Sequence, residues 1–291
     1  RRRIDSAHFR QGNPECGLAL VYLHGCADAA DLWYPLERQD FHSSPAMRLT
    51  GQRALEMAGI SLDEIGHMDL YSCFPVAVEI GAEELGLSLD DPRGLTLTGG
   101  LPYFGGPGNN YAMHSIGALM RRLRANRGDY GLITANGWFL TKQSTGVYST
   151  RAPDRPFERE DPAVLQRQID ALPHPEIIES PEGRAVIETY TVVHGREGYL
   201  MGIVVGRDEA DRRFVAHTPA DPETLHGLEA VESVGRRGRG GAAAEAGLLD
   251  LRARREERLD RLGLAGPPPK ASVPSSFRTD PHAPSLSDPP R

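Results

Sequence analysis

Apolar residues between positions 18 and 149 fall in short runs and in helix-spaced sets, a pattern that predicts alternating strands and helices. The nearly continuous apolar run 18–23 (LALVYL) predicts a buried strand that ends at His24-Gly25. The stretch that follows, CADAADLWYPLERQDFHSS, has no such run and predicts a loop. The pattern thus places one strand and one long loop at the start of this region.

A helix is predicted over 46–58, because Ser43 or Ser44 before Pro45 is a typical helix start and Gly59 is a typical helix end. The residues expected to supply part of its buried face are Leu55, Met57 and Ala58.

The rest of this region continues the alternation of strands and helices. The predicted elements are, in order, a strand over 68–71, a helix over 76–87 opened by Pro75, a helix over 112–123, a strand over 130–135, a turn at Asn136-Gly137 and a return strand from Trp138 to Tyr148. Such alternation predicts an α/β fold in which helices cover a sheet.

Changes in composition divide the chain into four parts. Residues 1–150 form the α/β part, and the charged, Pro-punctuated residues 151–174 predict a linker with one short helix. Residues 175–237 alternate β-branched and polar positions, which predicts a small antiparallel β domain with a hairpin at TVVHGREGYLMGIVVG and a short helix after Asp221. Residues 238–291 are rich in Arg, Gly, Ala and Pro and predict a disordered tail.

Charge and cysteine content exclude some classes of function. The net charge of −7 over 291 residues argues against a general nucleic-acid binder. Cys16, Cys26 and Cys73 have no CxxC spacing and cannot all pair, which favours reduced thiols in a cytoplasmic protein. No apolar run approaches the length of a membrane span, so we expect no membrane partner. A start on Arg1 leads us to expect a fragment of a longer chain.

The stretch 97–114, LTGGLPYFGGPGNNYAMH, is a candidate binding loop. Its glycines include Gly105 and Gly106, and glycine lets a ligand or another backbone approach closely. Asn109 or Asn110 is expected to cap the helix that follows, which would leave the first N–H groups of that helix free for an anion or an oxyanion. A Gly-rich connection between two packed elements would have the same composition.

Two further groups of polar residues are candidates for chemistry. Cys73 directly follows the predicted strand 68–71, near the start of the next helix, a position that favours a reactive thiol; a buried structural cysteine is the alternative. His24, His42 and the nearby aspartates suggest a metal site only weakly, because their spacing is scattered. We therefore predict no metal site.

Five segments, in order, resemble the C-terminal half of the thiolase superfamily, in particular bacterial thiolase-like proteins of the acetyl-CoA acetyltransferase type with an additional small C-terminal domain. The segments are HGCADAADLW, SSPAMRLTGQRALEMAGI, DLYSCFPVAVEIGAEELGL, LTGGLPYFGGPGNNYAMHSIGALMRRLR and YGLITANGWFLTKQSTGVYST. The resemblance implies half of an αβαβα core and exchange of acyl groups with coenzyme A thioesters, which are substrates rather than bound cofactors. It also implies a nucleophilic cysteine in an N-terminal half that no part of this chain matches.

The catalytic loops of the family can be carried over residue by residue. In the Gly-His-Pro loop, Gly106 stands at the position of the histidine, and His114 lies eight residues later. In the His-Asp-Cys-Phe loop, Cys73 keeps the position of a cysteine associated with acid/base chemistry. In the Cys-x-Gly loop, Asn136 and Gly137 follow Ala135, which replaces the cysteine. The resemblance thus makes Cys73 and His114 the catalytic candidates, and Gly105, Gly106, Asn109, Asn110, Asn136 and Gly137 the substrate and oxyanion loops.

Together these features predict an acyltransferase of thiolase type whose activity is impaired or altered. A general base contributes about 10²–10⁴-fold in rate, and an oxyanion donor about as much, so the missing histidine and cysteine remove most of the acceleration. The alternatives are a non-catalytic acyl-CoA-binding or assembly protein on a thiolase scaffold, or an interaction module that keeps only the scaffold. The expected partners are acyl-CoA and either a second copy or a partner subunit.

Overall fold

The structure, a computed structural model, describes residues 19–179 and 181–240. These residues divide into two compact units. The first comprises the described residues up to Ile178 together with Asp211–Arg213, and the second comprises the rest. The segments 1–18 and 241–291, and with them Cys16 and most of the predicted tail, lie outside the described residues.

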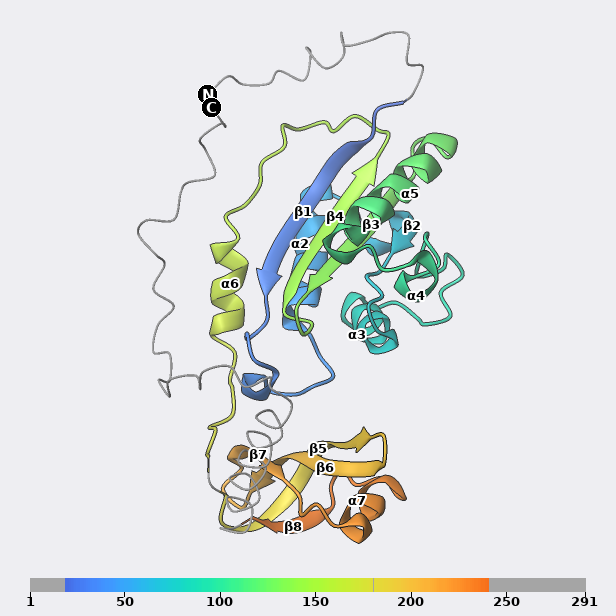
Figure 1. Cartoon of the computed structure of the whole chain (residues 1–291). Helices are drawn as coiled ribbons and strands as arrows, with labels where there is room; N and C mark the ends of the chain where they lie inside the picture. Colours follow the sequence, from blue (N-terminus) through green and yellow to red (C-terminus); the bar gives the residue numbers. More distant parts are fainter. Residues whose placement is uncertain (1–18, 180, 241–291) are drawn as a thin grey trace, which may run out of the picture. The chain divides into compact units, whose positions relative to one another are not determined.

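A four-stranded sheet forms the centre of the first unit, in the order β1-β4-β3-β2 (Figure 1). β4 pairs antiparallel with both β1 and β3, and β3 pairs parallel with β2. The strand bounds are β1 Tyr22–Ala30, β2 Ile65–Asp69, β3 Tyr130–Gly137 and β4 Lys142–Ser149. The predicted α/β alternation is confirmed.

The first strand is misplaced by the sequence pattern. β1 begins at Tyr22 and runs to Ala30, through residues that were expected to form a loop. These residues are small because the next helix packs closely on the strand: a Cβ atom on Gly25 would lie 2.0 Å from the carbonyl oxygen of Ala54. A strand that is closely approached by a helix backbone needs small residues on that face, so it lacks the large apolar residues by which strands are recognised.

The reversal between β3 and β4 also differs from the prediction. Asn136 and Gly137 belong to β3 and pair with Gln143 and Lys142, so the chain turns at the residues that follow. Trp138 and Leu140 adopt left-handed backbone conformations there, with φ of 63° and 53°. Such angles are unusual for large residues, so Trp138 and Leu140 give no turn signal in the sequence. The preceding Asn-Gly pair does give one, and the sequence therefore predicts the turn there.

Helices cover both faces of this sheet (Figure 1). α2 (Pro45–Ala58) and α3 (Pro75–Leu85) pack on one face, where Leu132 and Val147 belong to the core. α5 (Tyr111–Ala125) packs on the other face, where its Leu119 and Leu123 contact Ile133. The change of face between Leu132 and Ile133 follows the two-residue period of a strand.

The predicted ends of α2 are confirmed. The side chain of Ser44 accepts a hydrogen bond from the backbone N–H of Met47, and Gly59 ends the helix in a left-handed conformation (φ 69°). Leu55 and Ala58 pack against the core as expected, although they are only partly buried, whereas Met57 is partly buried and does not belong to that cluster. The fully buried residues of the helix are Ala46, Met47, Thr50, Gly51 and Ala54.

Shorter helices complete the first unit. α4 (Leu101–Phe104) lies within the glycine-rich stretch, and α6 (Ala163–Asp170) is the one short helix predicted between the two parts of the chain. The 3₁₀ turns are η2 (Pro35–Glu37), η3 (Leu62–Glu64) and η4 (Gly108–Asn110).

The second unit is a small antiparallel sheet in the order β7-β6-β5-β8, with one helix. Its elements are β5 Gly183–Gly195, β6 Gly198–Asp208, β7 Arg213–His217, α7 Pro222–Glu229 and β8 Arg237–Gly240. The predicted hairpin is β5–β6, and the carboxylate of Asp221 accepts from the backbone N–H of Thr224 at the start of α7. The expectation of disorder is wrong for 238–240, which belong to β8.

Among the residues that the structure describes, no helix is both long and apolar enough to cross a membrane.

Candidate functional site

A cavity of about 780 Å³ opens in the first unit, beside the ends of three strands. Its walls come from the end of β1, the β3–β4 hairpin, the residue Tyr71 after β2, the start of α5 and the helix α6. The predicted site residues among its lining are Asn109, Asn136 and Gly137. Parts of the chain that are far apart in sequence therefore meet at one concave surface.

Asn136 links this cavity to Cys73. The side-chain amide of Asn136 accepts a hydrogen bond from Gln143 Nε2 at 3.2 Å and donates one to the sulfur of Cys73 at 3.4 Å. Cys73 itself is half-buried and does not line the cavity. The structure therefore brings two of the predicted residues together, with the amide between the thiol and the open space.

Tyr71 and Ser72 position the loop that carries Cys73. The backbone N–H of Tyr71 donates to Thr134 Oγ1 at 2.9 Å, and Ser72 Oγ accepts from the backbone N–H of Leu101 at 2.9 Å. Tyr71 lines the cavity. Burial is the main cause that raises the pKa of its phenol above the ordinary value, and the nearby Cys73 and Tyr111 raise it further. At neutral pH Tyr71 is therefore a neutral hydroxyl at the cavity wall.

The carboxylate of Asp69 holds the glycine-rich stretch against α5. Asp69 is fully buried at the end of β2. Its Oδ2 accepts from the backbone N–H groups of Leu97 and Thr98 at 2.8 and 3.1 Å, and its Oδ1 accepts from Ser115 Oγ at 2.8 Å. The hydroxyl groups of Thr96, Thr98 and Tyr111 also donate to it. One buried acceptor thus organises the loop and the helix after it.

The glycine loop has the predicted freedom but not the predicted cap. Gly105 and Gly106 are exposed and have φ of 111° and 51°, and a Cβ atom on either would meet nothing within 4 Å. Asn110 occupies the N-cap position of α5 but makes no capping hydrogen bond with its side chain. Its amide points to the helix instead, 3.3 Å from His114 Nε2. The expected asparagine cap is therefore wrong.

His114 does not reach the cavity. Its exposed ring lies against Phe104, with ring centroids 5.0 Å apart, and it is not among the cavity-lining residues. The first turn of α5 directs it toward the exposed end of the glycine loop, because Asn110 contacts its ring from four residues earlier. The structure thus separates His114 from the pair formed by Cys73 and Asn136.

Sequence reasoning missed Lys142, Gln143 and the cavity wall formed by α6. Gln143 is a buried polar residue within a strand, and its place in the polar run KQST was the one available signal. Nothing in the sequence indicated that a helix from the presumed linker would lie beside the β3–β4 hairpin.

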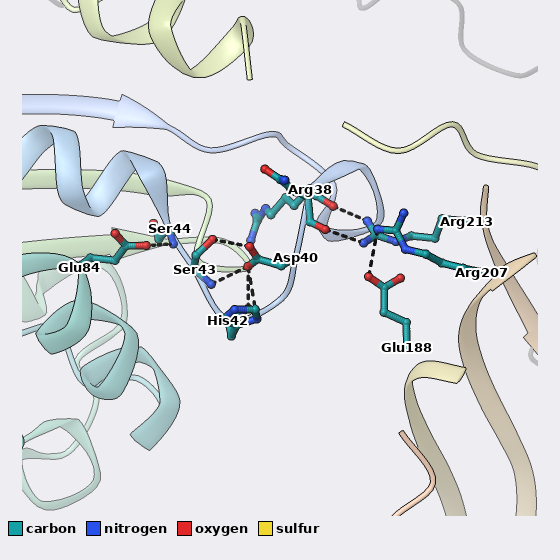
Figure 2. Close-up of polar contacts among 10 residues, drawn as sticks. Arg38, Asp40, His42, Ser43, Ser44, Glu84, Glu188, Arg207 and Arg213 are labelled. Atoms are coloured by element: carbon teal, nitrogen blue, oxygen red, sulfur yellow. Dashed lines mark hydrogen bonds and ion pairs between the residues drawn. The ribbon is translucent and has the colours of Figure 1, made fainter. Parts of the chain in front are cut away.

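The histidines and aspartates of the segment 24–42 are used in local structure, and Figure 2 shows this for Asp40 and His42. Asp40 accepts from the backbone N–H groups of His42 and Ser43 at 3.1 and 2.8 Å, and His24 Nε2 contacts the carbonyl oxygen of Arg151 at 2.9 Å. The residues that the structure describes contain no group of three or more His, Cys, Asp or Glu side chains that could hold a metal ion.

A buried arginine fixes the same segment (Figure 2). The guanidinium of Arg213, which has no exposed surface, donates to the carbonyl oxygens of Leu36, Arg38 and Gln39. Arg38 in turn donates to Phe139 O at 2.9 Å and to Thr141 Oγ1 at 2.8 Å. This chain of contacts supports the left-handed turn between β3 and β4, next to the cavity.

Comparison with known proteins places both parts of the chain. Residues 164–242 match the family described as the thiolase-like protein type 1 additional C-terminal domain. No curated protein matches the chain. Among solved structures, the monomeric SCP2-thiolase like protein type 1 from Mycobacterium smegmatis is similar with 42% identity and a TM-score of 0.69.

The match to the Mycobacterium smegmatis structure covers 75% of this chain and 47% of that protein, so the chain spans about half of its length. The ishigamide ketosynthase/chain length factor is similar over 44% of this chain and 34% of its own, with 18% identity and a TM-score of 0.36. The α/β unit, the small antiparallel sheet and the match at 164–242 agree with one another. The chain therefore belongs to the thiolase-like proteins that carry an additional C-terminal domain.

Proposed function

We propose that this chain binds a coenzyme A thioester in the cavity beside Asn136, on a thiolase scaffold that lacks the proton-transfer groups of a thiolase. The observation that carries the proposal is the composition of the cavity wall. It contains amide and hydroxyl groups, including Asn109, Asn136 and Tyr71, and the charged side chains of Asp28, Lys142, Arg167 and Asp170, but no histidine and no cysteine. Such a wall can bind and orient a thioester, but it offers neither an imidazole nor a thiol for proton transfer, and both of its carboxylates are engaged, Asp28 by Arg159 and Asp170 by Gln166.

The size of the cavity fits a ligand of this kind. Small-molecule sites typically enclose about 300–1,000 Å³, and the cavity of about 780 Å³ falls in that range. The amide of Asn136 and the phenol of Tyr71 are neutral polar groups at its wall. Neutral hydrogen-bonding groups suit the thioester and amide groups of an acyl-pantetheine arm, which are themselves uncharged.

The position of Gly106 supports binding over catalysis. The family resemblance puts this glycine where thiolases carry a histidine, and the structure has only open space around it. His114 could replace that histidine only by leaving its contacts with Phe104 and Asn110. No histidine of this loop therefore lines the cavity, and the side chain that the loop contributes to the wall is the amide of Asn109.

A second candidate function rests on the contact between Cys73 and Asn136. With a thioester in the cavity, the thiolate of Cys73 would take a proton from the α-carbon of the acyl group and later return one to the same carbon. Asn136 lies between the sulfur and the cavity, so this reaction requires the amide to move aside. This activity is the proton-transfer part of a Claisen-type acyl exchange. Because no acyl group is transferred, it does not require a nucleophilic cysteine that carries an acyl group.

Two measurements on the same chain separate these candidates. Calorimetric titration with acetyl-CoA tests binding, and proton NMR of acetyl-CoA in deuterium oxide tests exchange at its α-carbon. The proposal predicts saturable binding, with α-proton exchange and thiol release no faster than without protein. Absence of binding overturns it. Exchange that disappears in Cys73→Ala, with binding retained, would establish the second candidate instead.

A further inference from the structure

The helix α6 forms one wall of the cavity, although its sequence falls almost wholly within the additional domain. The family match begins at residue 164, and α6 spans Ala163–Asp170. In the structure this helix belongs to the first unit. It contributes Ala163, Gln166, Arg167 and Asp170 to the cavity lining. The added segment is thus part of the candidate site.

α6 is fixed to the sheet by hydrogen bonds and by apolar packing. The side-chain amide of Gln166 accepts from the backbone N–H of Ala30 and donates to its carbonyl oxygen, both at 2.9 Å. β1 is an edge strand of the described sheet, so the backbone groups along its outer side have no neighbouring strand in that sheet to pair with. The amide of Gln166 pairs with those of Ala30. Leu165 and Ile169 are buried beneath the helix, and Figure 1 shows α6 alongside β1. The wall is therefore anchored in the fold.

Two cations line the cavity from different elements. Arg167 projects from α6, and Lys142 begins β4, where its side chain lies across Gly137 with Nζ 3.5 Å from the place of a Gly137 Cβ. Within 19–179 and 181–240, neither side chain has a hydrogen bond or an ion pair. By contrast, both carboxylates of the lining have partners: Asp28 pairs with Arg159, and Asp170 accepts from Gln166 at 2.9 Å.

We infer that α6 is a specificity element of this site, and that Arg167 and Lys142 together hold an anionic group of the bound ligand. The inference rests on the proposed function and adds the chemistry of the ligand to it. A phosphate of coenzyme A or a carboxylate at the end of the acyl group would supply such an anion. In either case the group bridges the additional segment and the β3–β4 hairpin, as two cations of different elements converge on it.

The test uses three ligands that differ in the position of their charge. S-acetylpantetheine is uncharged, S-succinylpantetheine adds one carboxylate, and acetyl-CoA adds the phosphates. Affinities are measured by calorimetry at fixed ionic strength for the unaltered chain, Arg167→Gln, Lys142→Gln and the control Arg121→Gln. Arg121 is exposed on α5 and does not line the cavity, so this control removes a positive charge outside the site.

The expected result is a loss of about ten- to hundredfold in affinity for each cavity variant, because hydrogen bonds to charged groups are of this strength. The loss should affect acetyl-CoA if the anion is a phosphate, or S-succinylpantetheine if it is a carboxylate. S-acetylpantetheine and the control variant should show no change. An equal loss for all three ligands, or no loss for any, overturns the inference while the proposed function stands. If no ligand binds the unaltered chain, the proposed function fails and the inference with it.

Discussion

The side-chain amide of Asn136 donates a hydrogen bond to the sulfur of Cys73 at 3.4 Å, and this amide, not the thiol, faces the cavity. The relationship assigns different roles to two residues that sequence comparison places together. Asn136 is available to a ligand, whereas Cys73 lies behind it. The two residues are therefore expected to respond differently to substitution.

Asn136→Ala should weaken acetyl-CoA binding by about three- to tenfold, because it removes a hydrogen-bonding group from the cavity wall. Cys73→Ala should change the affinity by less than about twofold, because a residue that does not contact the ligand contributes little to binding. Calorimetry on both variants checks this contrast. Equal losses in the two variants would show that the thiol itself contacts the ligand.

Asp69→Ala should lower the free energy of unfolding by about 3 kcal/mol or more, because it leaves several buried donors without an acceptor. These donors include Ser115 Oγ and the backbone N–H of Leu97. Urea unfolding measures the loss, and amide hydrogen exchange should show faster exchange at Leu97 and Thr98. The control Asp90→Ala alters an exposed carboxylate and should stay within about 0.5 kcal/mol of the unaltered chain. A similar loss in both variants would mean that Asp69 does not organise the loop.

Gly25→Ala should destabilise the first unit by about 1–3 kcal/mol, because the new methyl group would overlap the backbone of Ala54. Gly117→Ala is the matched change in open space: nothing lies within 4 Å of its Cβ position, and it lies within a helix. That substitution should stabilise the fold by about 0.5–1 kcal/mol. Thermal unfolding compares the two variants, and the same sign for both would refute the close approach of α2 to β1.

Asp91 is expected to contribute to the acid sensitivity of the fold. Hydrogen bonds from Arg93 lower the pKa of its carboxyl to about 2 from the ordinary value of 3.8. A lowered folded-state pKa favours the ionised carboxylate, so its contribution is present above the unfolded-state pKa and is lost as pH falls toward about 2. Asp91→Asn should therefore flatten the dependence of unfolding free energy on pH between about 4 and 2. An unchanged slope in urea titrations at stepped pH would contradict this assignment.

The sequence predicts those elements whose signals are local. Ser44, Pro45 and Gly59 mark the ends of α2 by their own backbone chemistry, and the β5–β6 hairpin follows from alternation and a short Gly-containing turn. β1 is not predicted because the close backbone of α2 requires small residues in it, and such residues have low strand propensity. The turn at Trp138 and Leu140 is missed for a similar reason, since Arg38 holds it from a distant segment.

The candidate site is predictable to a smaller extent. Motif comparison identifies Asn136, Gly137 and Asn109, which do line the cavity. Proximity in sequence to the glycine loop suggests His114, but its ring lies against Phe104 and does not line the cavity. Gln143 and Arg167 reach the site through strand pairing and helix packing over long sequence separations. Such convergence has no signature in a single sequence.

The most direct test of the central claim locates the bound thioester by hydrogen–deuterium exchange with and without saturating acetyl-CoA. The account predicts slower amide exchange in two segments, 135–144 of the β3–β4 hairpin and 163–170 of α6, because both form walls of the same cavity. Binding without slower exchange in either segment, or slower exchange confined to residues away from the cavity, would contradict it.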